Sequence, residues 1–74
     1  MLDISYNGIQ VIVGIEALVN LKHLNLGYNR LTQVDSLKGC VALERIDLQG
    51  NQIKDTRTLE VIAGGLENLK VLYL

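Results

Sequence analysis

The stretches LNLGYNRL (24–31) and IDLQGNQI (46–53) decide the fold, because they carry the same pattern 22 residues apart. In each stretch, apolar and other residues alternate up to an asparagine, and a further aliphatic residue follows two positions later. LDISYNGI (2–9) carries the pattern a third time, again 22 residues away. Self-similarity at a fixed period indicates a repeat architecture, in which stacked units share one core. The three equivalent asparagines are Asn7, Asn29 and Asn51.

The remainder of units one and two is also periodic, with an apolar residue at every third position. A step of three held over several turns suits 3₁₀ or irregular coil better than an α-helix. Unit three differs, because it spans 26 residues instead of 22. Asp55 or Thr56 can cap a helix in this unit, and Gly64–Gly65 can end it in a left-handed conformation. We therefore predict a short α-helix over roughly 56–63.

These features predict a single α/β domain over residues 1–74, folded as a right-handed solenoid of repeating coils. The repeats occupy 1–23, 24–45 and 46–71, and a fourth begins after them. The alternating segments become short parallel strands, about 4.8 Å apart, on a concave sheet. The 3₁₀ and short α segments lie on the convex side. No unit can bury its own leucines, so stability comes from contacts between neighbouring coils.

The repeated asparagines stand where the chain leaves each strand and bends inward. A buried asparagine there can use its amide donors and its acceptor on backbone groups of its own coil and the next one. A leucine would leave those groups unpaired, at about 1–3 kcal/mol each. We interpret Asn7, Asn29 and Asn51 as a structural ladder rather than as ligands.

The residues between the leucines are expected to point out of the concave sheet, and equivalent positions in adjacent units become neighbours. Tyr6 should therefore lie beside Tyr28, and His23 beside Arg45. A third column across the sheet should contain Asp3, Asn25, Asp47 and Tyr73.

A protein partner is the ligand that this face favours, because Tyr and Arg are enriched at the centres of protein interfaces. The alternative is that Tyr6 and Tyr28 only cover the core near a turn. Gly27 is expected on the same outward face. The candidate protein-binding residues are Tyr6, His23, Asn25, Tyr28, Arg30, Arg45, Asp47, Gln49 and Tyr73.

Other classes of function find little support in the sequence. A net charge of −1 offers no basic face for nucleic acid. The first residues show neither a signal peptide nor a membrane span, because polar residues interrupt their apolar run. Cys40 occupies an apolar repeat position whereas His23 faces the sheet surface, so the two do not form a thiol dyad. We expect no catalytic residue, no metal site and no cofactor.

The motif Leu21-x-x-Leu24-x-Leu26-x-x-Asn29-x-Leu31 resembles the pattern of the leucine-rich repeat family, and the likeness covers essentially the whole chain. The 22-residue unit is similar to a subclass that includes protein phosphatase regulatory subunits and ciliary and centrosomal proteins. The resemblance implies a scaffold that binds another protein through its concave face. It also implies an intracellular location, whether cytoplasmic, ciliary or nuclear.

Two further interpretations stay open at this point. The chain could be a structural spacer, a fragment of a larger scaffold of repeats, or it could regulate an enzyme of the phosphatase type. Polar end units normally close a solenoid, whereas apolar residues stand at both ends of this chain. We therefore expect self-association through uncapped ends as a further means of contact.

Overall fold

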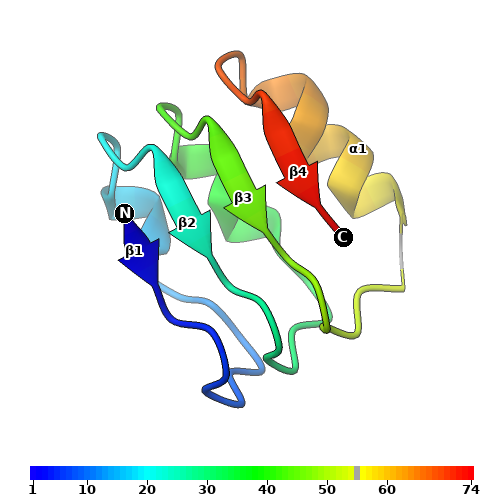
Figure 1. Cartoon of the computed structure of the whole chain (residues 1–74). Coiled ribbons are helices and arrows are strands. Elements are labelled where there is room, and N and C mark those ends of the chain that lie inside the picture. The colour runs from blue at the N-terminus through cyan, green and yellow to red at the C-terminus, as the bar shows by residue number, and fades with distance from the viewer. Residues whose placement is uncertain (55) are drawn as a thin grey trace.

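The computed structural model describes residues 1–54 and 56–74 and shows four short strands side by side in one sheet (Figure 1). The strands follow chain order, and all three pairings are parallel. Leu24 lies opposite both Leu2 and Ile46, so the repeat positions are in register across the sheet. The predicted parallel sheet is confirmed. Its strands are β1 (Leu2–Asp3), β2 (His23–Asn25), β3 (Arg45–Asp47) and β4 (Val71–Tyr73).

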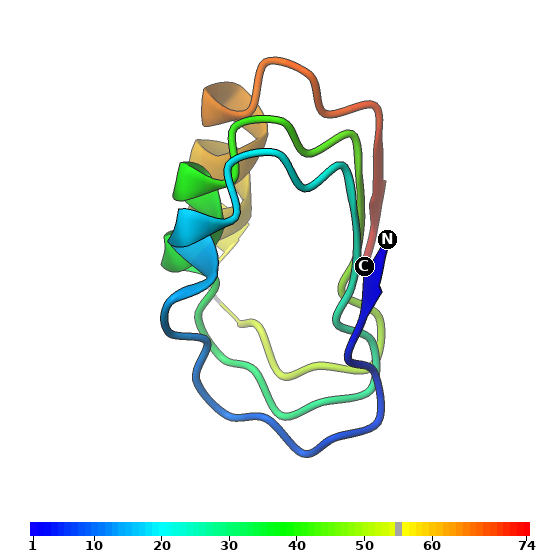
Figure 2. The same cartoon turned by 90° about the vertical axis from the view of Figure 1, so that its left-hand side faces the viewer.

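A second layer of helical segments faces the sheet across the interior (Figure 2). Units one and two contribute the 3₁₀ helices η1 (Ile15–Ala17) and η2 (Asp35–Gly39), and unit three contributes the α-helix α1 (Thr56–Gly65). The predicted change from 3₁₀ to α structure in the third unit is therefore confirmed. The strands β2 and β3 each begin one residue before the predicted start of their unit.

The predicted end of the α-helix is wrong. Gly64 and Gly65 lie within α1, and neither is among the glycines with positive φ. The Leu66 N–H continues the helical pattern by donating to the Ile62 carbonyl at 3.0 Å, and the Leu66 side chain is buried. Burial of Leu66 therefore directs the chain back toward the core without a left-handed glycine. The predicted cap at Asp55, and the side chain of Thr56, lie outside the described residues.

The core lies between the two layers and consists of the repeated aliphatic positions. Cys40 is completely buried among them, as its place in the repeat predicts. Leu18 occupies the same repeat position in the first coil but is 42% exposed. It lies in the first coil, where the apolar hollow leaves part of its surface open. The fully buried side chains are Leu24, Leu26, Leu31, Val34, Leu37, Cys40, Leu43, Ile46 and Ile62.

Candidate functional site

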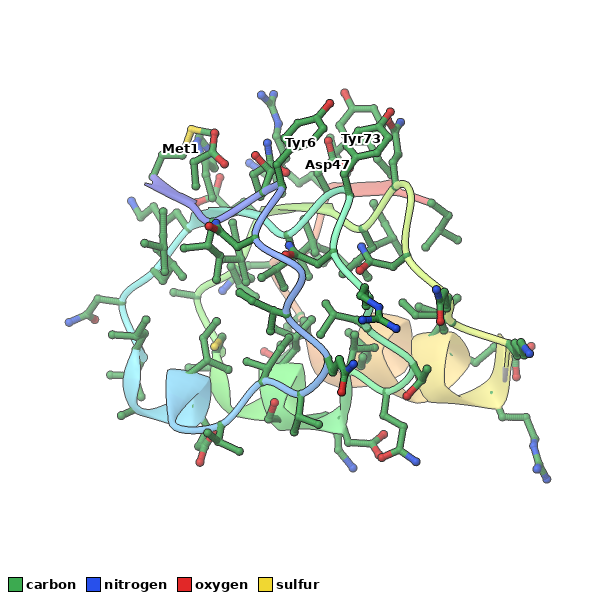
Figure 3. All side chains as sticks on the ribbon, turned by 90° about the horizontal axis from the view of Figure 1, so that it is seen from below. Met1, Tyr6, Asp47 and Tyr73 are labelled. Atoms are coloured by element: carbon green, nitrogen blue, oxygen red, sulfur yellow. The ribbon has the colours of Figure 1, made fainter. Side chains whose placement is uncertain are left out.

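The outward face of the sheet brings together the residues that the repeat predicts to be neighbours. His23 pairs with Arg45 on adjacent strands. Tyr6, Asp47 and Tyr73 project from the sheet on the side away from α1 (Figure 3). The register also confirms the predicted column, which runs through Asp3, Asn25, Asp47 and Tyr73.

Tyr6 and Tyr28 form a stacked aromatic pair on this face. Their ring centroids are 4.7 Å apart and their planes differ by 9°. Tyr6 is 74% exposed and Tyr28 is 49% exposed. The predicted proximity of the two residues is confirmed, and the pair presents aromatic surface to solvent. Rigid aromatic surface of this kind supplies contact area at low entropic cost.

The backbone at these tyrosines adopts a left-handed conformation that the sequence analysis missed. Tyr6 has φ 60° and Tyr28 has φ 57°, and Gly50 at the same repeat position has φ 73°. A non-glycine residue in this region costs roughly 1–2 kcal/mol. The sequence contained a signal for this conformation. Gly50 stands immediately before Asn51, just as Tyr6 stands before Asn7 and Tyr28 before Asn29. Glycine at one of three equivalent positions indicates that all three need positive φ.

Gly50 also provides the space into which the Tyr28 ring fits. A Cβ atom added at Gly50 would lie 2.4 Å from the Tyr28 Cδ1 atom. The Tyr28 ring thus rests against the backbone of the third coil, and the Tyr6 ring stacks on Tyr28. The aromatic pair is therefore supported by three consecutive coils.

The column of Asp3, Asn25 and Asp47 has a structural task that the sequence analysis also missed. Each side chain accepts a hydrogen bond from the backbone N–H two residues further on, at 2.9–3.0 Å. Such turns are a known use of Asp and Asn, and their recurrence at the repeat interval was the available signal. Asp3 additionally accepts the Ser5 hydroxyl at 2.7 Å. The bonds from the hydroxyl and the N–H of Ser5 hold the pKa of the Asp3 carboxyl below its ordinary value.

The asparagine ladder is present, but it reaches back to the preceding coil rather than forward. The Oδ1 atom of Asn29 accepts from the N–H groups of Asn7 and Ile9, at 2.9 and 3.1 Å. Its Nδ2 group donates to the carbonyl of Ile4 in the same preceding coil, at 3.0 Å. Asn51 repeats this pattern by accepting from Leu31 and donating to Leu26.

Asn7 differs from the other two ladder residues because it has no preceding coil in the structure. It is exposed, and its amide donates locally to the Ser5 carbonyl at 3.0 Å. The predicted bond to its own coil is therefore present, whereas its side chain makes no bond to another coil among the described residues.

The remaining candidate residues lie toward the edges of this face. The Gln49 carbonyl accepts from the Tyr28 N–H at 2.6 Å, so its backbone supports the aromatic pair. Arg30 is exposed and lines a hollow of about 260 Å³ on the loops that follow the strands. Gly27 lies on the outward side of the sheet as expected, because an added Cβ would be 3.1 Å from Asn25 Oδ1 and 3.6 Å from Asp47 Oδ1, but it is buried. Its backbone is covered because its carbonyl accepts from Tyr6 in the adjacent coil at 3.0 Å.

Metal binding needs grouped ligands, and thiol catalysis needs a reactive cysteine. Among residues 1–54 and 56–74, no three His, Cys, Asp or Glu side chains are grouped to hold a metal ion. The Cys40 thiol donates to the Ile15 carbonyl at 3.1 Å, away from the sheet face that carries His23. Burial, with a smaller contribution from Glu16, raises the pKa of the Cys40 thiol, which disfavours the nucleophilic thiolate. The part of the chain that the structure describes contains no helix of the length and apolarity that a membrane span needs.

One end of the solenoid exposes an apolar hollow. It has a volume of about 490 Å³ and lies on the outer side of the first coil. Val11 and Val13, at its rim, are 70% and 83% exposed. The hollow is lined by Leu2, Ile4, Ile9, Val11, Ile12, Val13, Gly14, Ile15 and Leu18.

Comparisons with known proteins agree with this geometry. A rat protein named "Leucine-rich repeat and IQ domain-containing protein 3" is 36% identical over 73 residues, which cover 96% of this chain and 11% of the rat protein. The fission yeast "Septation initiation network scaffold protein cdc11" is 38% identical over 58 residues, or 78% of this chain and 6% of that protein. The human "Leucine-rich repeat-containing protein 4B" is 39% identical over 59 residues, which cover 80% of this chain and 8% of the human protein. The matched part of the chain thus spans 6–11% of the length of these relatives.

The relatives are named for their repeats or for a scaffold role, which supports a protein-interaction repeat module. The family described as "Leucine rich repeat" matches residues 1–53. With the asparagine ladder and the parallel strands in register, this match shows that the chain belongs to the leucine-rich repeat family.

Proposed function

We propose that this chain is a protein-interaction module whose sheet face binds a partner protein. The observation that carries the proposal is the exposed stack of Tyr6 on Tyr28. Exposed tyrosines on a rigid support are the type of residue that dominates binding energy in protein interfaces. His23, Arg45 and Tyr73 lie on strands of the same sheet and offer further side chains that can contact a partner.

The conformation of the two tyrosines supports the same proposal. Both keep a strained left-handed backbone, although glycine or asparagine would adopt it at lower cost. Strain of this kind concentrates at functional sites. Retention of the rings at these positions is explained if the rings bind something.

Substitution by asparagine tests this proposal, because asparagine tolerates the left-handed backbone while removing the ring. We expect a Tyr6→Asn/Tyr28→Asn double variant to lose partners in a quantitative affinity capture, with an unfolding midpoint close to that of the wild type. Val41→Asn is the matched control, because it removes an apolar side chain that is 56% exposed outside the strands. Partners that remain equally bound to the double variant would contradict the proposal.

The single substitution Tyr28→Ala gives a simpler check with a purified partner. We expect it to weaken binding more than it lowers stability. Unchanged affinity together with a lowered melting temperature would mean that the ring only covers the core.

A second candidate function is that of a structural segment in a larger array of repeats. The apolar hollow on the outer side of the first coil and the exposed Asn7 favour it. We propose that this surface stacks against another coil, either of the same polypeptide or of a second copy. Sedimentation of the 74-residue chain over a concentration series measures self-association, and a monomer at the highest concentration would exclude the second copy.

The cellular location of the protein and its subclass within the leucine-rich repeat family are also proposals. We propose an intracellular protein, cytoplasmic, ciliary or nuclear, because Cys40 has no second cysteine with which to form a disulfide. A role in regulating a phosphatase rests on resemblance to the 22-residue subclass. Imaging of the tagged protein checks the first proposal, and a phosphatase assay with added chain checks the second.

A further inference from the structure

Among residues 1–54 and 56–74, the carboxylates of Asp3 and Asp47 on the sheet face have no cationic partner. Asp3 and Asp47 each use Oδ1 to fix a turn, which holds the carboxylate in place. Lys70 pairs instead with Glu44, at 3.6 Å. The second oxygen of each aspartate is therefore available to a ligand.

A tyrosine is a neighbour of each aspartate, across the sheet for Asp47 and along the chain for Asp3. Tyr73 is the strand neighbour of Asp47, and it is 43% exposed. Tyr6 follows Asp3 in the same coil, immediately after the serine that bonds to Asp3. Tyr6, Asp47 and Tyr73 project on the same side of the sheet (Figure 3). Where a carboxylate lies beside an aromatic ring, a planar cation can pair with the carboxylate and stack on the ring at the same time.

We propose that this face binds an extended segment of a partner protein that carries two arginines three residues apart. One guanidinium pairs with Asp3 and the other with Asp47, and each lies against a neighbouring tyrosine. The inference rests on the proposed function and specifies its partner. Arginine fits better than lysine, because its planar fork matches a carboxylate and stacks on an aromatic ring.

The spacing follows from the geometry of the sheet. Asp3 and Asp47 lie on β1 and β3, with β2 between them. Two strand separations amount to about 10 Å. A polyproline II segment returns to the same side every third residue and advances by about 9 Å in that distance. A β-strand returns every second residue, after about 7 Å, and so matches less well.

Asn25 lies between the two aspartates and favours the same type of segment. Its Oδ1 atom accepts from Gly27, and within the described residues its amide group makes no further bond. A polyproline II backbone leaves its carbonyl groups free to accept hydrogen bonds. The amide of Asn25 is therefore placed to donate to the peptide between its two arginines.

The column of His23 and Arg45 lies next to the column of Asp3, Asn25 and Asp47, and Arg45 is exposed. Taken alone, this basic column would favour an acidic partner. An acidic partner segment would use that column. It would gain nothing from the tyrosines and would meet Asp3 and Asp47 with like charge. The two aspartates and the tyrosines together therefore favour a basic partner segment.

Titration of the whole 74-residue chain with a synthetic peptide tests this inference. The probe is a nine-residue proline-rich peptide with arginines at its third and sixth positions, followed by amide chemical shifts and by calorimetry. Two control peptides carry lysines at those positions, or arginines only two residues apart. We expect each control to bind at least about fivefold more weakly, which corresponds to about 1 kcal/mol. Shifts should gather at Asp3, Asn25, Asp47 and the tyrosines.

The matched variants are Asp3→Asn and Asp47→Asn. Asparagine keeps the Oδ1 acceptor that fixes each turn, as Asn25 does in the same column. We expect each variant to unfold at the wild-type midpoint and to bind the arginine peptide about fivefold more weakly. Equal binding of the arginine and lysine peptides, or an unchanged affinity of Asp47→Asn, would overturn the inference.

The result also separates this inference from the proposed function. A captured partner that needs Tyr6 and Tyr28 but is not displaced by the arginine peptide refutes the arginine segment and leaves the interaction module standing. If no partner depends on the tyrosines and the peptide does not bind, both proposals fail.

Discussion

Tyr28 and Gly50 illustrate how a single glycine can determine the orientation of a functional side chain. Both residues need positive φ, but only Gly50 lacks a Cβ atom, and the Tyr28 ring occupies the space that this atom would fill. The position before each asparagine therefore serves two purposes. In coils one and two it carries a ring, and in coil three it provides the surface on which the Tyr28 ring rests.

Gly50→Ala should displace the Tyr28 ring. We expect a loss of about 1–2 kcal/mol from the left-handed backbone, and a further 1–3 kcal/mol from the contact with the ring. Gly8→Ala is the matched control, because Gly8 also has positive φ but nothing within 4 Å of an added Cβ. Urea unfolding measures the difference and near-UV circular dichroism reports the ring. Equal losses in both variants would show that Tyr28 does not depend on Gly50.

The ladder of asparagines determines how one coil joins the next. Asn29 is 5% exposed and bonds to backbone groups of two coils, whereas Asn51 is partly buried and Asn7 is exposed. The three asparagines are equivalent in the repeat, but they therefore contribute differently to the free energy of unfolding.

Alanine substitutions along the ladder should reveal this order. We expect Asn29→Ala to cost about 3 kcal/mol or more, because it leaves several buried or part-buried backbone groups of both coils unpaired. Asn51→Ala should cost less, and Asn7→Ala should stay within about 0.5 kcal/mol. Unfolding midpoints in urea provide the test. A large loss in Asn7→Ala would mean that its coil is paired in solution.

The convex layer depends on close approach between η1 and η2. A Cβ atom at Gly39 would lie 2.5 Å from the Glu16 Cβ and 3.0 Å from its Cα. We expect Gly39→Ala to destabilise the chain by about 1–3 kcal/mol, because backbone rather than a flexible side-chain tip must move. Gly64→Ala is the control, since it has open space in α1 and should raise helix stability by up to about 1 kcal/mol. A neutral Gly39→Ala would indicate that the two turns can separate freely.

The solenoid as a whole shields Cys40, which makes the thiol a reporter of unfolding. Because burial raises the pKa of this thiol in the folded chain, the unfolded chain loses the proton at lower pH. Folding stability is then unaffected well below the ordinary thiol pKa and decreases as pH rises through it. We expect thermal midpoints to fall in that alkaline range, and Cys40→Ala to reduce the fall. An identical alkaline decrease in both proteins would assign it to other groups.

The repeated leucines and asparagines were sufficient to predict the parallel sheet, the register and the proximity of Tyr6 and Tyr28, and the longer third unit predicted the change from 3₁₀ to α structure. They were sufficient because a fixed period places equivalent residues on adjacent coils, whatever the remaining side chains are. The same period did not reveal the end of α1, since burial of Leu66 rather than a left-handed glycine returns the chain to the core.

Other features depended on contacts between coils. The stacking of Tyr6 on Tyr28, the fit of that ring against Gly50, the reach of Asn29 into the preceding coil and the exposure of Leu18 all follow from which coil lies beside which. One coil does not contain this information. The period fixed which residues meet, and packing in three dimensions decided how their side chains are oriented and how far each is buried.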